Sequence, residues 1–198
     1  MLRRLTDLVV RLASAGHQPE LHDVRGFRVV VENERPDIAT SAVLARLDEA
    51  LGLIERYQPW RLAHLRRDLA RIWVVRYACR GAYFPAERTC MTELTFLARR
   101  DITAAPVASS ILHEGVHARV HRMGERLGAR WDDRDRAREE RLCRKAELAF
   151  GRALPPALGA PVIERALASL ALDDEGVAPT IDWRVAQSRV DAVDRRSS

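Results

Sequence analysis

The spacing of hydrophobic and polar positions predicts helices in the first third of the chain. Between residues 41 and 57, apolar side chains recur every three or four positions, which is typical of one face of a helix. Residues 60–70, after Pro59, predict a shorter helix. An amphipathic helix is also predicted at the start of the chain from the apolar residues Leu2, Leu5, Val9 and Leu12. Asp7 and Arg11 make that run too polar for a signal peptide.

The middle of the chain predicts short strands, because β-branched and aromatic residues are concentrated between turn residues. The predicted strands are 71–77, 82–84 and 89–97, with a further strand at 27–31. In the segment 89–97, polar and apolar residues alternate as in a half-exposed strand. We expect a small antiparallel sheet whose edge strand can pair with an extended peptide, although a purely structural sheet would give the same pattern.

Two longer helical patterns follow the predicted sheet. Pro106 suits the first turn of a helix, and apolar residues recur at helical spacing from there to Met123. A second helix is predicted from about Asp135 to Leu154, where Pro155 and Pro156 end it. The fold class is therefore α+β.

We expect the 198 residues to form a single domain with three parts. Residues 1–70 form a mainly helical part, and residues 71–155 contribute the sheet and the two long helices. Residues 156–198 form a helical C-terminal appendage, with a helix at 161–172 and a polar last helix.

The run His113-Glu114-Gly115-Val116-His117 carries the candidate chemistry. Residues i and i+4 of a helix lie about 6 Å apart, so two such imidazoles can bind one Zn²⁺ through bonds of about 2.0–2.1 Å. Glu114, between them, is placed to take a proton from water at the metal. The alternative is a solvated helix face whose histidines bind nothing. His121 is excluded as a ligand, because eight residues rise about 12 Å along a helix.

A catalytic zinc normally has three protein ligands and one open position, so a third ligand is expected from elsewhere. On the next predicted helix, Glu140 and Glu147 project near an apolar face that holds Cys143 and Phe150. A carboxylate directed at a core is costly unless it is paired or bound to a cation. The alternative is a pairing with arginines, such as Arg144 four residues after Glu140.

The HExxH helix, followed by a helix that supplies a glutamate, resembles the gluzincin branch of the zincin metallopeptidases. The segments 113–119, 138–143 and 147–150 are similar to those of uncharacterised bacterial zincin-like proteins. The resemblance implies a zincin-like fold and a zinc peptidase that acts on a peptide or protein substrate.

Carried over by position, the resemblance makes His113, His117 and Glu140 the zinc ligands and Glu114 the general base. Glu139 is the competing third ligand. Glu147 lies two turns beyond Glu140, about 10 Å along the axis, and is expected to hold a ligand histidine instead.

The chain departs from the gluzincin pattern in two respects. The Asn before the third-ligand glutamate and the Asp one turn after it are missing around Glu140. No histidine follows His121 to stabilise an oxyanion, so Tyr83 and Arg119 are considered for that role. These departures keep open a catalytically inactive metal-binding or interaction module as an alternative function.

The net charge and the cysteine content narrow the possible functions and partners of the protein. The net charge is +5, but the arginines are interspersed with 28 acidic residues, which argues against nucleic acid as a partner. A nucleic-acid-associated protease is the second alternative function. Three cysteines do not make a disulfide framework. No segment approaches the length of a membrane span, and we expect a cytoplasmic protein without membrane contact.

Overall fold

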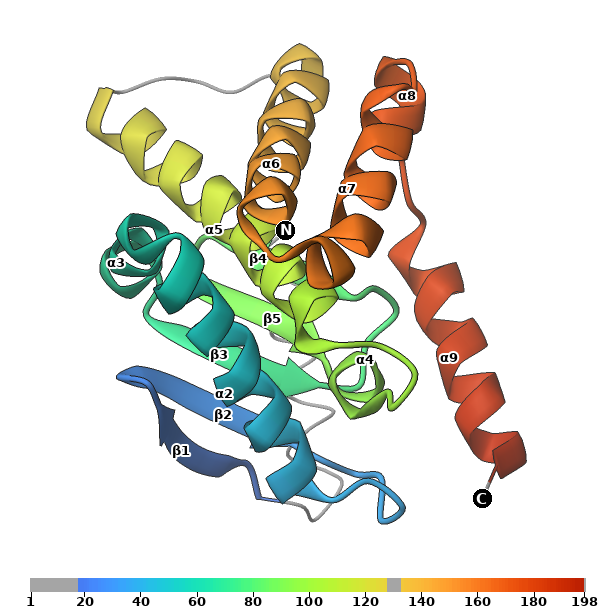
Figure 1. The fold of residues 1–198 in the computed structure, drawn as a ribbon. Coiled ribbons are helices and arrows are strands. Elements are labelled where there is room, and N and C mark those ends of the chain that lie inside the picture. Colours follow the sequence, from blue (N-terminus) through green and yellow to red (C-terminus); the bar gives the residue numbers. More distant parts are fainter. Residues whose placement is uncertain (1–17, 128–132, 198) are drawn as a thin grey trace.

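A computed structural model describes residues 18–127 and 133–197 of the chain (Figure 1). The helix predicted around Leu2–Leu12 lies outside the described residues. The strands are β1 (Glu20–Val24), β2 (Phe27–Glu32), β3 (Arg71–Val75), β4 (Gly81–Phe84) and β5 (Thr89–Glu93). The helices are α2 (Thr40–Tyr57), α3 (Pro59–Asp68), α4 (Leu94–Ala98), α5 (Ala104–Leu127), α6 (Asp133–Ala153), α7 (Pro156–Leu170), α8 (Asp174–Val177) and α9 (Trp183–Ser197). The α+β class predicted from the sequence is confirmed.

The five strands form one mixed sheet in the order β1-β2-β3-β5-β4. The expected antiparallel sheet is wrong at its centre, where β3 pairs parallel with both β2 and β5. Helices α2 and α3 connect β2 to β3, and such a helical crossover returns the chain in the same direction. Only the outer pairs, β1 with β2 and β4 with β5, are antiparallel. Strand β4 is therefore an edge strand.

The strand predicted to reach Leu97 ends at Glu93, because a short helix begins there. The Glu93 carboxylate accepts a hydrogen bond of 2.7 Å from the backbone N–H of Phe96, which caps the first turn of α4. The sequence prediction missed this cap and also missed strand β1.

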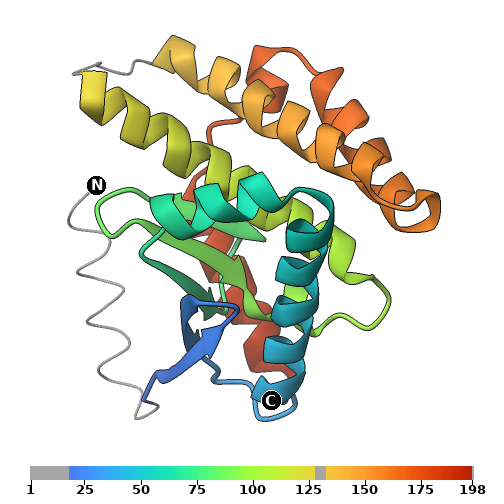
Figure 2. The same cartoon turned by 60° about the vertical axis from the view of Figure 1, so that its left-hand side comes forward.

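The main core lies between one face of the sheet and helices α2, α3 and α5 (Figures 1 and 2). Val29, Val31, Ile72 and Val74 face this core, while the alternate strand residues form a smaller cluster on the other face. The alternation follows from the two-residue period of a strand. Figure 2 shows α9 in red behind the sheet, where the Trp183 ring lies 6.3 Å from that of Tyr77.

Helix α5 is covered on one side by α6, and α7 packs in turn on α6 (Figure 2). A Cβ atom on Gly159 of α7 would lie 2.2 Å from the carbonyl oxygen of Gly151 in α6, so the two backbones approach closely. Val162 of α7 is buried in the main core. Helix α7, at the start of the predicted C-terminal segment 156–198, is thus packed against the rest of the structure. None of the described helices combines the length and apolar character that crossing a membrane requires.

Candidate metal centre

The two histidines of the HExxH run project from α5 with their ring nitrogens directed at one point. The Nε2 atoms of His113 and His117 are 3.2 Å apart, and His113 is buried. The apolar side of α5 packs on the sheet and fixes the helix at this position. The one-turn spacing predicted from the sequence therefore brings both rings together.

Glu140 reaches the same point from α6. Its Oε2 atom is 3.3 Å from Nε2 of His113, and its Oε1 atom is 3.4 Å from Nε2 of His117. Four-coordinate tetrahedral zinc with bonds of about 2.0–2.2 Å holds its ligand atoms roughly 3.3–3.6 Å apart. The two distances from Glu140, one from each carboxylate oxygen, fall in this range, and the 3.2 Å between the two Nε2 atoms lies just below it.

The other ring nitrogen of each histidine is held by a glutamate of α6. The Nδ1–Oε1 distance is 2.6 Å between His113 and Glu147, and 2.7 Å between His117 and Glu139. Because a carboxylate accepts, each Nδ1 carries a proton, and Nε2 is the ring atom that each histidine turns toward Glu140. Glu139, the competing third ligand, therefore lies behind His117.

Glu147 is itself fixed by two further contacts. Arg144 donates to its Oε1 atom at 2.7 Å, and the hydroxyl of Ser109 donates to its Oε2 atom at 3.2 Å. Arg144 thus pairs with Glu147, three residues away, and not with Glu140 as the alternative interpretation had it. From the sequence, Glu147 is expected to hold one of the two histidines, and it contacts His113.

The electrostatics of the cluster favour a cation. Burial lowers the pKa of His113, but its hydrogen bonds with Glu140 and Glu147 outweigh burial and raise that pKa overall. For Glu140 the balance is reversed: burial raises its pKa, and the two histidines bring it well below its ordinary value. An ionised carboxylate beside two imidazoles is a donor set that suits Zn²⁺, which would replace the protons that Glu140 favours on the two Nε2 atoms.

Glu114, the predicted general base, is buried where strand β4 begins. Burial raises the pKa of its carboxyl group. A Cβ atom on Gly81 would lie 2.9 Å from Oε1 of Glu114 and 2.9 Å from Oγ of Ser110. Because Gly81 has no side chain, the edge strand β4 can approach Glu114 closely. The sequence analysis missed Gly81, although a glycine at a strand start signals close approach.

Cys143 of α6 is a further residue at this site that the sequence analysis assigned only to an apolar face. Its Sγ atom and ring nitrogens of His113 and His117 lie within 4.8 Å of one another. Burial raises the pKa of the thiol to about 11. A zinc-bound cysteine is a thiolate at about 2.3 Å, so Cys143 is a candidate for the third ligand beside Glu140, which is the one that the sequence predicts.

Within the described part of the chain, neither Tyr83 nor Arg119, the two side chains considered for oxyanion stabilisation, makes a hydrogen bond or ion pair with the metal cluster. The Tyr83 ring lies 6.2 Å from that of His121, one turn beyond His117. The Arg119 guanidinium lies 3.6 Å from the Asp68 carboxylate on α3. His121 lies with its Nδ1 atom 3.4 Å from the Glu125 carboxylate.

Comparison with known proteins identified no relative of this chain. No family model matches the sequence, and neither a curated protein nor a solved structure matches the chain. Function is therefore inferred from the geometry of the site.

Proposed function

We propose that this protein is a zinc-dependent hydrolase that cleaves peptide bonds. The observation that carries the proposal is the convergence of His113, His117 and Glu140, at separations of 3.2–3.4 Å between their ligand atoms. Both histidines are backed by glutamates on the opposite ring nitrogen. A chance cluster of polar side chains has no reason to satisfy both conditions together.

The chain's own residues divide the chemical work. His113, His117 and Glu140 would hold the ion, and Glu139 and Glu147 would fix the two rings. Zinc, when bound, supplies a Lewis acid that polarises a carbonyl and lowers the pKa of water in the open position. Glu114 would take the proton from the attacking water and deliver it to the leaving amine, a role that its raised pKa favours.

The position of β4 supports a peptide as substrate. Among the described strands β4 pairs with β5 alone, so its other edge can pair with an extended chain. The first residue of β4, Gly81, lies against Glu114. A peptide added to this edge would therefore run past the proposed general base.

The test is a Glu114→Gln variant compared with wild type on labelled casein and a quenched peptide library. We expect the variant to keep its zinc and to lose activity by about 10²–10⁴-fold, which is the usual contribution of a general base. Glu164→Gln, an equal charge change at an exposed position on α7, serves as the control. A zinc-loaded Glu114→Gln protein with full activity would reject the mechanism.

The structure also gives the inactive alternative one supporting observation. Among the described residues, Arg119 contacts Asp68 rather than the metal cluster, and the buried hydroxyl of Tyr83 has no hydrogen-bond partner. A zinc-loaded wild type that cleaves neither casein nor any library peptide would favour a metal-binding module over a peptidase.

A further inference from the structure

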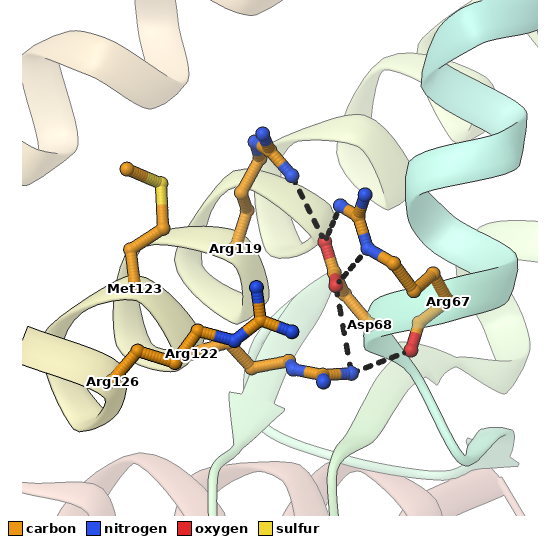
Figure 3. Close-up of a pocket in the computed structure, with 6 residues that line it drawn as sticks. All are labelled: Arg67, Asp68, Arg119, Arg122, Met123 and Arg126. Carbon is orange, nitrogen blue, oxygen red and sulfur yellow. Dashed lines mark hydrogen bonds and ion pairs between the residues drawn. The ribbon is translucent and has the colours of Figure 1, made fainter.

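A second polar cluster lies where the end of α3 meets the C-terminal half of α5. It consists of Arg67 and Asp68 from α3 and of three arginines from α5: Arg119, Arg122 and Arg126. With Met123, these side chains line a cavity of about 210 Å³ (Figure 3). We call this group the arginine pocket.

Asp68 organises the arginine pocket. Its side chain is 4% exposed, and Arg67 donates to both carboxylate oxygens, at 2.9 and 2.8 Å. Arg119 and Arg122 each approach the same carboxylate at 3.6 Å. Burial raises the pKa of Asp68, but the three arginines outweigh burial and lower it overall. The carboxylate is therefore ionised and balances one of the four guanidinium charges.

The remaining positive charge is not balanced inside the pocket. Arg126 has no hydrogen-bond or ion-pair partner among the side chains that the structure describes, and Figure 3 shows it turned toward Arg122. Its sequence neighbour Glu125 pairs instead with His121. The 3.6 Å contact of Arg119 with Asp68 is too long for a hydrogen bond, so the guanidinium keeps unused donors.

Arg122 has a structural role in the arginine pocket, which is distinct from any role in binding a ligand. Arg122 donates to the carbonyl oxygen of Arg67 at 2.6 Å, and Arg88 donates to the same oxygen at 2.7 Å. These contacts satisfy a carbonyl at the end of α3, where helices leave such groups unpaired. Within the described residues, Arg119 and Arg126 do not donate to a backbone carbonyl, so their guanidinium N–H groups are the ones available to a ligand.

We propose that the arginine pocket binds a phosphate group. A phosphate carries up to two negative charges and several acceptor oxygens, so it can accept from guanidinium groups on both helices at once. A single carboxylate would leave most of the excess charge unbalanced. The cavity volume equals that of roughly seven waters at about 30 Å³ each, so a phosphate and part of the molecule that bears it can enter.

The arginine pocket is separate from the proposed metal centre. Arg119 and Arg122 follow His117 by two and five residues, which places them about 140–200° around the helix axis from it. The histidines face α6, whereas the arginines face α3. The phosphate site therefore does not depend on the proposed hydrolase function.

The test is calorimetric titration with inorganic pyrophosphate at constant ionic strength, supported by fluorescence anisotropy with a labelled oligothymidine. We expect Arg119→Gln/Arg126→Gln to weaken binding by about tenfold or more, because hydrogen bonds to a charged group are lost. Arg152→Gln/Arg189→Gln removes the same charge at two exposed positions elsewhere and should bind as wild type. Circular dichroism melts establish that both double variants fold.

Each outcome decides the proposal. Pyrophosphate binding that is lost in Arg119→Gln/Arg126→Gln but retained in His113→Ala supports a site for small phosphate compounds, distinct from the metal centre. Oligothymidine binding that depends on the same two arginines, without pyrophosphate binding, supports a nucleic-acid phosphate as the occupant. Absence of both, or equal binding by the two double variants, overturns the proposal.

Discussion

Oε1 of Glu147 lies 2.6 Å from Nδ1 of His113, and this contact links the two long helices of the site. Both side chains are buried, with 1% and 9% of their respective surfaces exposed. The hydrogen bond fixes the proton on Nδ1 and turns Nε2 toward Glu140. Glu147 is thus positioned to set the orientation and basicity of a proposed zinc ligand without touching the ion.

We predict that Glu147→Gln weakens zinc binding without abolishing it. An amide accepts a hydrogen bond less strongly than a carboxylate, and loss of such a partner typically costs about 10–100-fold in metal affinity. Competition with a chromophoric chelator measures the affinity. Glu164→Gln, which is exposed on α7, should match wild type, and equal affinities for the two variants would contradict the role of Glu147.

Zinc is expected to stabilise the fold, because its proposed ligands join α5 to α6. A ligand that binds only the folded state at 100 times its Kd contributes about 2.7 kcal/mol. For a domain of this size, that corresponds to a rise in Tm of roughly 5–11 °C. Calorimetric melts with zinc and with a chelator test this, and His113→Ala should show no shift. Identical wild-type melts under both conditions would count against a bound ion.

Gly81→Ala is predicted to lower hydrolytic activity while leaving zinc content intact. The added methyl group would lie 2.9 Å from the Glu114 carboxylate and would displace it. A misplacement of about 1 Å can cost on the order of 10²-fold in rate. Steady-state kinetics and zinc analysis of the same sample provide the measurement.

Gly52→Ala is the matched control for this substitution. A Cβ atom on Gly52 would meet the flexible end of Arg25 at 3.0 Å, on α2 and away from the metal cluster. Activity that falls equally in both alanine variants would show that the effect is not specific to Glu114.

Asp68→Asn is predicted to destabilise the protein in a pH-dependent way. The arginines around it hold the pKa of Asp68 below its ordinary value, so its stabilisation is complete above about pH 4 and is lost as pH falls through the folded-state pKa. We expect a loss of about 1.5–3 kcal/mol in the free energy of unfolding at pH 7, which shrinks below pH 4.

Urea unfolding of both proteins between pH 3 and pH 7 measures that difference. Asp101→Asn, which breaks an exposed ion pair with Arg99, should change stability little at any pH. A deficit in Asp68→Asn that is constant across this range would contradict the assigned role of the charge.

The helices and the ligand spacing could be predicted from sequence because both depend on local periodicity. His113 and His117 converge because they lie one turn apart on a helix whose apolar side packs on the sheet. Glu140 and Glu147 were found because carboxylates beside an apolar face require a partner. In each case the sequence pattern that allows the prediction lies within a few residues of the position that it predicts.

The features that sequence analysis missed depend on contacts between distant segments. The parallel pairing of β2 with β3 is set by the crossover through α2 and α3, which strand composition does not report. Glu93 ends β5 by capping α4, although the alternation of residues there continues as in a strand. The close approach of Gly81 to Glu114 joins residues 33 positions apart and follows only from the position of β4 against α5.

The zinc content of the purified protein tests the central claim most directly. Elemental analysis should be run on wild type, Glu140→Ala and Cys143→Ser after equal exposure to zinc and removal of excess metal. We predict one zinc per chain in wild type and Cys143→Ser, and little or none in Glu140→Ala. Wild-type protein without zinc would contradict the account, and zinc lost from Cys143→Ser but kept by Glu140→Ala would contradict the assigned ligand set.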